Sequence, residues 1–544
     1  MAMKEHRVSS WSTGAVMSLI LCLILALVMR VPHFEDALTA DEVWMLAGSA
    51  GHGRDIAFYW KKDVLQEGFG NPTALENARG IPEIWQNNVA GHPPLHALTL
   101  RLWREVFGGT DEVARAYSSA WSLLTVWMIF VSLRLQFNTA VATCASILYA
   151  LSPLQIHLGT EIRSYAMVIA FLSIAAWLMV RMETLGASRG QVWSLGLLTL
   201  PMMLSHYLAM GPCLAIALWG TWRLRRFMRM EFMISLAISA CLFLVLWMPF
   251  AGEDFSGFSG DGNQWLISSD TMNRLKSVAG LPVLLLITNN VAKVTTINGA
   301  RLLGILSIAL LAIVGYGCFK DRRIHVWSLL LFIPAIVLLG IDLLGGTEMV
   351  RWSRYGSFAT LGIIAAPIAS GLAIHKRFGW FLAGLLILSM VPFTGLERDL
   401  GSPRHDHMIH AFSSVVLRYP VKLPLASINV SIDSGALGQG WDASMIHWYR
   451  LPGFLPRSTL VLSEKPDPNV LDILRKSTTN SQFWLTSYGA CSEQRSNHSS
   501  AWMRYRLPGI HPLKGPWIVA GGQGIRSERP PMCLQLMKFN NSSL

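Results

Sequence analysis

The chain has 544 residues, of which 52% are hydrophobic and 14% are charged, with a formal net charge of +12. A mean hydropathy of +0.40 excludes an ordinary soluble enzyme, in which charged residues approach about a quarter of the chain. The basic residues cluster at the ends of apolar runs, which is typical of membrane topology and argues against a nucleic-acid partner. The composition therefore predicts a polytopic α-helical membrane protein.

The first apolar run, residues 15–29, follows a short basic segment that carries Lys4 and Arg7. No small-residue cleavage pattern follows it, so we interpret it as a retained signal anchor with its N-terminus in the cytoplasm. With this run, the hydropathy predicts about eleven transmembrane helices. The others are expected near 115–133, 138–155, 164–181, 192–207, 208–222, 231–250, 300–318, 327–344, 355–373 and 378–395.

Two further segments are apolar but do not fit a span. Residues 281–287 are too short, and we expect them to form an interfacial segment. The long first loop, 31–114, contains short helix-like runs at 81–85 and 94–103. The second of these is amphipathic and charged, so it is expected to lie in the plane of the membrane interface. Its apolar face would carry Leu95, Leu98, Leu102 and Val106, with Arg101, Arg104 and Glu105 elsewhere.

The charges of the short loops test this layout. Counted through the predicted spans, the turns at Arg134, Arg181/Arg189, 223–229, 320–323 and 375–377 all fall on the side of the N-terminus. An excess of Lys and Arg on one side marks the cytoplasmic face. Arg30 is a small exception. This topology places the C-terminal tail outside the cytoplasm.

The tail changes in composition. Strand-like runs begin at Ser427, Thr459, Phe483, Trp517 and Cys533, and helix-like runs cover 408–417 and 469–476. This alternation predicts a small extracytoplasmic α/β domain over 396–544, after a transmembrane catalytic domain over 1–395 that includes the loop 31–114. Cysteine usage agrees, because five cysteines lie in or beside spans, whereas Cys491 and Cys533 in the tail suggest one disulfide.

Candidate functional residues gather on the predicted outer face. Asp41 and Glu42 follow the first span, and adjacent acids are costly unless at least one is used. They could equally favour the start of a helix through Trp44. The remaining candidates are His92 before two prolines, Glu161, Arg163 and Tyr165, His206 with Tyr207, and Arg351, Arg354 and Tyr355.

Each of these has an ordinary alternative. His92 could simply end a loop, His206 and Tyr207 could be satisfied polar groups at a turn, and Arg163 and Tyr165 could anchor in headgroups. Arg351 and Arg354 share a helical face, and outward-facing arginines run against the charge bias. Together, a carboxylate pair, a histidine and arginines suit transfer from an anionic lipid-phosphate donor. The carboxylate would act as general base, while the arginines would hold the phosphate.

An ordered set of motifs supports this chemistry. The set comprises Asp41-Glu42 after the first span, His92-Pro-Pro-Leu before the interfacial helix, Phe107-Gly with Arg115 opening the next span, Ser152-Pro153 leading into Glu161-Ile-Arg163-Ser-Tyr165, and Arg354-Tyr355-Gly. Over about residues 14–395 their order resembles the GT-C superfamily of integral-membrane glycosyltransferases. The similar branch contains the protein O-mannosyltransferases, the lipid A aminoarabinose transferases and related bacterial lipopolysaccharide sugar transferases.

The resemblance implies a polyprenyl-phosphate-linked sugar donor, an extracytoplasmic active site and inversion at the anomeric carbon. Asp41 would be the catalytic base with Glu42 beside it, and His92 would contact the donor phosphate or a carboxylate. Arg163 and Tyr165 match an Arg-x-Tyr motif, Arg354 matches a late Arg-Tyr, and Glu161 is the nearest candidate for an acidic residue of the lipid A branch. His206, Arg351 and Tyr355 complete the predicted substrate site.

The resemblance leaves several points open. The sugar is not encoded in any motif, and the acceptor could be a protein hydroxyl, lipid A, another glycan or another lipid. Some relatives use a divalent metal ion, for which Asp41, Glu42 and His92 could supply ligands, although we expect no permanent site. A bacterial plasma-membrane location, in contact with membrane lipids, is expected. The competing hypotheses are a transporter or flippase for a lipid-linked or anionic solute, for which only Asp342 lies near mid-span, and a non-catalytic scaffold.

Overall fold

The computed structural model describes residues 11–34, 40–53, 64–65, 73–86, 92–251, 271–287 and 297–391, together with five strands in the C-terminal part of the chain. These residues divide into two compact units. The first comprises Met1–Phe34 with Ala90–Leu400, and the second comprises Glu35–Val89 with Gly401–Leu544. Each unit is described separately below.

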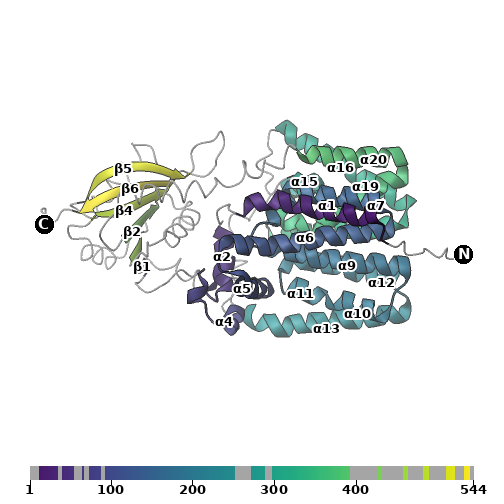
Figure 1. Ribbon diagram of the computed structural model, residues 1–544, viewed down its shortest axis with the longest axis horizontal. Coiled ribbons are helices and arrows are strands. Elements are labelled where there is room, and N and C mark those ends of the chain that lie inside the picture. The colour runs from purple at the N-terminus through teal and green to yellow at the C-terminus, as the bar shows by residue number, and fades with distance from the viewer. Residues whose placement is uncertain are drawn as a thin grey trace, which may run out of the picture. The chain divides into compact units, whose positions relative to one another are not determined.

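The first unit is helical. Its long helices lie side by side with nearly parallel axes (Figure 1). They are α1 (Thr13–Arg30), α5 (Leu95–Phe107), α6 (Asp111–Gln136), α7 (Thr139–Leu151), α8 (Pro153–Leu158), α9 (Tyr165–Leu185), α10 (Arg189–Leu197), α11 (Thr199–Met203), α12 (Met210–Arg223), α13 (Arg226–Ala251), α15 (Thr271–Ile287), α16 (Ile297–Lys320), α17 (His325–Gly345), α18 (Ser353–Gly356), α19 (Thr360–Ile374) and α20 (Lys376–Met390). Short 3₁₀ turns join some of them: η1 (Val31–His33), η3 (Tyr207–Ala209), η6 (Arg322–Ile324), η7 (Met349–Arg351) and η8 (Ser357–Ala359).

Six helical segments within the described residues are long and apolar enough to cross a membrane: Thr13–His33, Asp111–Gln136, Tyr165–Leu185, Arg226–Phe250, Arg322–Gly345 and Ser353–Ile374. Thr139–Leu151 and Gly304–Lys320 are shorter apolar helices. The chain is therefore an integral membrane protein, as its composition predicted. Within the described residues, the predicted spans lie on helices, some of them broken, but a count of about eleven full-length spans stays a prediction.

One expected span differs from the structure, and another expected segment is part of a longer helix. The predicted span 192–207 is not one helix, because α10 ends at Leu197, α11 ends at Met203, and His206 adopts an extended backbone before η3. Residues 281–287 form the second half of the longer helix α15, and Leu281, Leu284 and Leu285 are at most 2% exposed. The polar first half, from Thr271, extends the helix, and the interfacial location of 281–287 stays a prediction.

Arg30, which ran against the charge bias, is buried within the bundle. Its side chain is 0% exposed. It donates to Ser122 Oγ on α6 at 3.0 Å, to Gln155 O on α8 at 3.1 Å and to Ala26 O on α1 at 2.9 Å. The guanidinium therefore links three helices, so the charge of Arg30 does not count as a loop charge in the topology.

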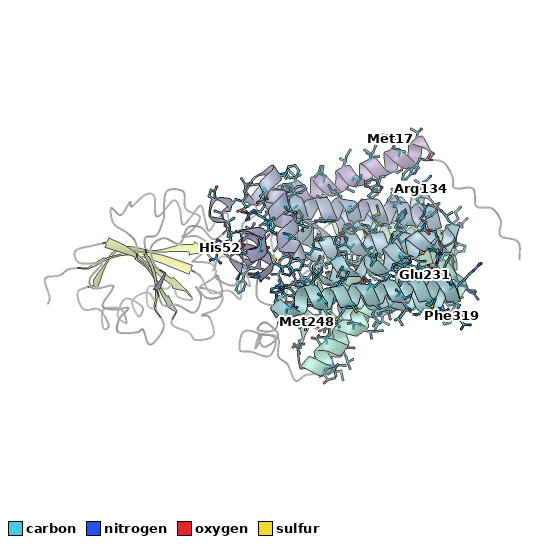
Figure 2. All side chains as sticks on the ribbon, turned by 90° about the horizontal axis from the view of Figure 1, so that it is seen from below. Met17, His52, Arg134, Glu231, Met248 and Phe319 are labelled. Atoms are coloured by element: carbon cyan, nitrogen blue, oxygen red, sulfur yellow. The ribbon has the colours of Figure 1, made fainter. Side chains whose placement is uncertain are left out.

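The turns predicted to be cytoplasmic gather at one end of this unit. Figure 2 shows Arg134, Glu231 and Phe319 at that end and Met248 toward the opposite end. Polar contacts tie the turns together there. Gln136 Nε2 donates to Arg323 O at 2.8 Å, and Arg223 Nε donates to Glu183 Oε1 at 2.9 Å. The basic turns therefore lie together at one end of the unit, as the loop charges predicted. That this end faces the cytoplasm stays a prediction.

The second unit contains α2 (Ala40–Ser49), η2 (Leu75–Asn77), α4 (Ile81–Gln86) and a six-stranded sheet. The strands are β1 (Val64–Leu65), β2 (Ala426–Ser431), β3 (Ser458–Leu462), β4 (Gln482–Tyr488), β5 (Ile510–Ala520) and β6 (Met532–Phe539), in the order β1-β3-β2-β4-β6-β5. The strand β2 runs parallel to both β3 and β4, whereas the pairs β1–β3, β4–β6 and β5–β6 are antiparallel.

The tail therefore has strands at the five predicted runs. Parallel pairs need crossover connections, and the predicted helix 469–476 falls between β3 and β4. It lies outside the described residues, as does 408–417, so the α/β character stays a prediction. The domain division differs from the expected one, because β1 pairs Val64 with Leu460 and Leu65 with Thr459. This pairing brings part of the first loop into the unit that contains the tail.

Candidate active site at the start of α9

The turn between α8 and α9 carries the predicted Glu161 and Arg163. Both side chains are buried, with exposures of 3% and 8%. Two polar side chains of α6 hold the carbonyls of this turn, since Ser119 Oγ donates to Gly159 O at 2.8 Å and Arg115 Nη1 donates to Thr160 O at 3.2 Å. Hydrogen bonds from α6 therefore fix the backbone of this turn, which orients the side chains that follow it.

Tyr165, the first residue of α9, meets aromatic side chains from distant parts of the chain. Its ring centre lies 5.1 Å from that of His206 and 6.1 Å from that of Phe358 in η8. The ring of His92 lies 5.7 Å from that of His206, edge to face. Four of the predicted elements thus converge: the segment before α5, the turn before α9, the break after α11, and the segment that leads into α19.

The polar atoms of this cluster are only partly satisfied. His206 Nδ1 accepts from Leu208 N at 3.1 Å, which leaves Nε2 as the hydrogen-bearing nitrogen of a neutral ring. Among the described residues, His206 Nε2 and Tyr165 Oη are buried and have no hydrogen-bond partner. Buried polar atoms without partners cost free energy unless water or a ligand satisfies them. Their clustering therefore indicates a binding site.

Two guanidinium groups supply positive charge to the same cluster. Arg163 lies over the ring of Tyr165 at 5.8 Å, and Arg354 lies 5.1 Å from the ring centre of Tyr355, to whose hydroxyl its Nη2 donates at 3.3 Å. Glu161 Oε2 lies 3.8 Å from His157 Nε2. Arginine presents several donors in one plane, which suits the oxygen atoms of a phosphate.

His96 is a member of this neighbourhood that the sequence analysis missed. It is 2% exposed, its ring lies 5.5 Å from that of Tyr117, and neither ring nitrogen has a partner among the described residues. The available signal was its spacing, because His96, Leu100 and Arg104 recur every four residues along α5 and all three are buried. The apolar face predicted for α5, with Leu95, Leu98, Leu102 and Val106, does not include His96.

Both buried histidines are neutral. Burial lowers the pKa of His96 to about 3, helped by the charges of Arg163 and His92. Burial also lowers the pKa of His206 well below its usual range, with further contributions from His92, Arg163, Arg354 and His96. Neutral imidazoles add hydrogen-bonding capacity beside the arginines without adding charge. The positive charge of the cluster therefore comes from its arginines.

Asp41 and Glu42 lie in the first turn of α2, in the second compact unit. Glu42 is 1% exposed and Asp41 is half-buried. The alternative that they begin a helix is thus confirmed, since carboxylates there complement the helix dipole. The structure defines each unit separately, so a catalytic role for the pair stays a proposal.

The remaining predicted residues lie beyond this cluster or outside the described side chains. Arg351 ends η7, but its side chain is not among those described. Cys491 is outside the described residues, whereas Cys533 lies in β6 opposite Ser487, so their disulfide is untested. Among the described cysteines, Cys22, Cys144, Cys213, Cys241 and Cys318 are free thiols, as expected. The described residues contain no group of three or more His, Cys, Asp or Glu side chains that could hold a metal ion.

Comparisons with known proteins point to membrane glycosyltransferases. Residues 91–250 match the family model described as dolichyl-phosphate-mannose-protein mannosyltransferase. This stretch contains His92, His96, Glu161, Arg163, Tyr165 and His206. The resemblance to the GT-C glycosyltransferases is confirmed by this match for residues 91–250. No curated protein sequence matches the chain.

Several solved structures are distantly similar. The transferase ArnT from Cupriavidus metallidurans bound to undecaprenyl phosphate is 12% identical with a TM-score of 0.45, over 96% of this chain and 98% of that chain. The archaeal oligosaccharyltransferase AglB from Archaeoglobus fulgidus is 11% identical with a TM-score of 0.44, over 92% and 73%. The Pmt1–Pmt2 protein O-mannosyltransferase of S. cerevisiae is 14% identical with a TM-score of 0.30, over 48% and 36%. Likeness at this level is too low to define the fold of the chain.

Proposed function

We propose that this protein is a GT-C-type glycosyltransferase that moves a sugar from a polyprenyl-phosphate donor to an acceptor hydroxyl outside the cytoplasm. The observation that carries the proposal is the cluster of Arg163 and Arg354 around Tyr165 Oη and His206 Nε2, which are buried and have no hydrogen-bond partner among the described residues. Such a cluster suits a bound oxyanion held partly out of water. The family model matched by residues 91–250 is named for a dolichyl-phosphate sugar, which supports a lipid phosphate as that oxyanion.

The chemistry needs a base and a stabilised leaving group. In the proposed reaction, the carboxylate of Asp41 removes the proton of the acceptor hydroxyl, and the oxygen attacks the anomeric carbon with inversion. The bond between that carbon and the phosphate oxygen breaks, and its electron pair leaves with the polyprenyl phosphate. Arg163 and Arg354 stabilise the charge that grows on this phosphate. No step requires a metal ion.

One observation weakens the transporter hypothesis. Asp342 was the acidic side chain expected near mid-span, but it lies in the last turn of α17 and accepts hydrogen bonds from the loop that follows. A transport carboxylate would instead face a water-filled path or a mobile partner. The residue therefore has a structural explanation.

Asp41→Asn tests the proposed base. We expect it to reduce transfer by at least about 1,000-fold while membrane insertion and donor binding persist, since the amide cannot accept the proton. Transfer is measured by mass spectrometry of acceptor and lipid-linked sugar with purified protein. Glu112→Gln, which removes a carboxylate from the first turn of α6, is the matched control and should stay active. A fully active Asp41→Asn protein would show that Asp41 is not the base.

A further inference from the structure

The carboxylate of Asp342 organises the loop that precedes Arg354. Asp342 is 0% exposed. Its Oδ1 accepts from Thr347 Oγ1 at 2.6 Å and from Met349 N at 2.8 Å, and its Oδ2 accepts from Val350 N at 2.7 Å. One side chain thus satisfies three donors of a segment that has just left the end of α17.

The same segment is held at two further points. Gly346 adopts a left-handed backbone, with φ of 66°, and its N–H and that of Thr347 both bond to the carbonyl of Asp342. From α15, Arg274 Nε donates to Thr347 O at 2.7 Å. Thr347 is therefore bound through its hydroxyl, its N–H and its carbonyl. Few alternative positions remain for a residue anchored in this way.

Few residues separate the anchored segment 347–350 from Arg354, and hydrogen-bonded turns connect them. Trp352 N donates to Met349 O at 2.9 Å, and Tyr355 N donates to Trp352 O at 3.0 Å. Arg354 lies 5.7 Å from the ring of Trp352. A displacement at Met349 or Val350 is consequently transmitted through these turns to the guanidinium.

We infer that Asp342 is a positioning residue for the anion site, because its carboxylate fixes residues 347–350 and so holds Arg354 where a lipid phosphate binds. This inference rests on the proposed function. A placement error of about 1 Å is enough to weaken a contact of this kind substantially. Asp342 itself touches no substrate.

Asp342→Asn tests the inference, because its amide group cannot accept from both backbone N–H groups. Binding of undecaprenyl phosphate is measured on the purified full chain by native mass spectrometry. We expect at least about 10-fold weaker binding, with faster hydrogen exchange at Met349 and Val350. Thr347→Val should weaken binding in the same direction, and Thr347→Ser, which keeps the hydroxyl, should restore the wild-type affinity.

The control separates positioning from stability. Gln136→Leu removes a buried side chain that bonds to Arg323 O and to Trp327 Nε1 at the other end of α17. It should lower the melting temperature without changing the affinity for undecaprenyl phosphate. Unchanged affinity in Asp342→Asn overturns the inference. A smaller loss of affinity in Thr347→Val than in Thr347→Ser overturns it as well. Unchanged affinity in Arg354→Ala overturns the proposed anion site itself.

Discussion

The rings of Tyr165 and His206 meet with their centres 5.1 Å apart, and each presents a buried polar atom without a partner among the described residues. Such atoms are rare in folded proteins, because burying them without a hydrogen bond costs free energy unless water or a ligand supplies the bond. In the proposed enzyme, the donor phosphate does so. The pair therefore predicts opposite effects on stability and on binding.

Tyr165→Phe removes the buried hydroxyl, which has no partner in the part of the chain that the structure describes. We expect the free protein to become more stable by about 1 kcal/mol, because a buried hydroxyl without a partner is destabilising, and donor binding to weaken by about 10-fold. Melting temperature and affinity for undecaprenyl phosphate measure the two effects. Tyr149→Phe is the matched control, since the hydroxyl of Tyr149 lies 3.4 Å from Ser122 Oγ. That variant should lose stability and keep its affinity. A Tyr165→Phe protein that is both less stable and unchanged in binding would contradict the assignment.

Arg354→Ala removes charge from the proposed phosphate site. The donor KM should rise by at least about 10-fold, because a charge-assisted contact to phosphate is worth about 1.5–3 kcal/mol. Arg354→Lys should recover only part of the loss, since a lysine cannot donate in the same plane. Steady-state transfer at varied donor concentration measures both variants. As a control, Arg323→Ala removes an arginine paired with Asp321 at the basic end of the bundle, where the donor KM should not change.

The buried histidines predict a dependence of stability on pH. The unfolded chain protonates His96 near pH 6.5, whereas in the folded protein burial keeps its pKa at about 3. Unfolding therefore takes up a proton between these values, so stability falls as the pH falls below about 6.5. The loss is about 2 kcal/mol between pH 7 and pH 5 for one such residue.

His96→Gln should flatten this dependence. Melting temperatures at pH 7 and pH 5 measure it in the wild type and the variant. His375→Gln, which changes an exposed histidine before α20, should keep the wild-type profile. An equal fall in the wild type and in His96→Gln would mean that other groups control acid stability.

Arg30→Leu tests the buried junction of α1, α6 and α8. The change removes the hydrogen bonds that the guanidinium donates to Ser122 Oγ, Gln155 O and Ala26 O, so we expect a loss of about 2–4 kcal/mol. Gly159→Ala should have a similar effect, because an added Cβ would lie 2.7 Å from Arg30 Nε and 2.7 Å from Ser122 Oγ. Melting temperature in detergent measures both, and Arg226→Leu, at an exposed position of α13, is the control. Stability unchanged in both variants would remove this structural role.

The membrane class and the helix positions could be predicted because apolar runs and loop charges are local properties of a sequence. The burial of Arg30 could not, because its partners come from α6 and α8 and no periodicity encodes them. For α5, the amphipathic pattern could be predicted from the sequence, but the face that is buried could not. Leu102 and Val106 are 46% and 74% exposed, whereas Arg104 is 1% exposed. In an interfacial helix, the apolar face can point outward to lipid, whereas in a soluble protein the apolar face of a helix packs against the core.

The association between residues 35–89 and the C-terminal tail was inaccessible for another reason. The strand β1 has two residues, too few to show an alternating pattern, and its partner β3 lies almost four hundred positions further along the chain. Pairing between such distant segments depends on the whole fold rather than on local sequence. His96 was missed because its four-residue spacing with Leu100 and Arg104 does not by itself show that the helix face they share is buried.

The pairing of Val64 with Leu460 also orders events during synthesis. At translation rates of about 5–20 residues per second, β1 leaves the ribosome some tens of seconds before the strand that completes its edge. The long helices of the bundle that follow α1 are made in this interval. The compact unit that contains Asp41 can therefore close only after the last strands emerge, so a ribosome that stalls within the tail leaves an inserted bundle whose proposed base is not yet held in its finished fold.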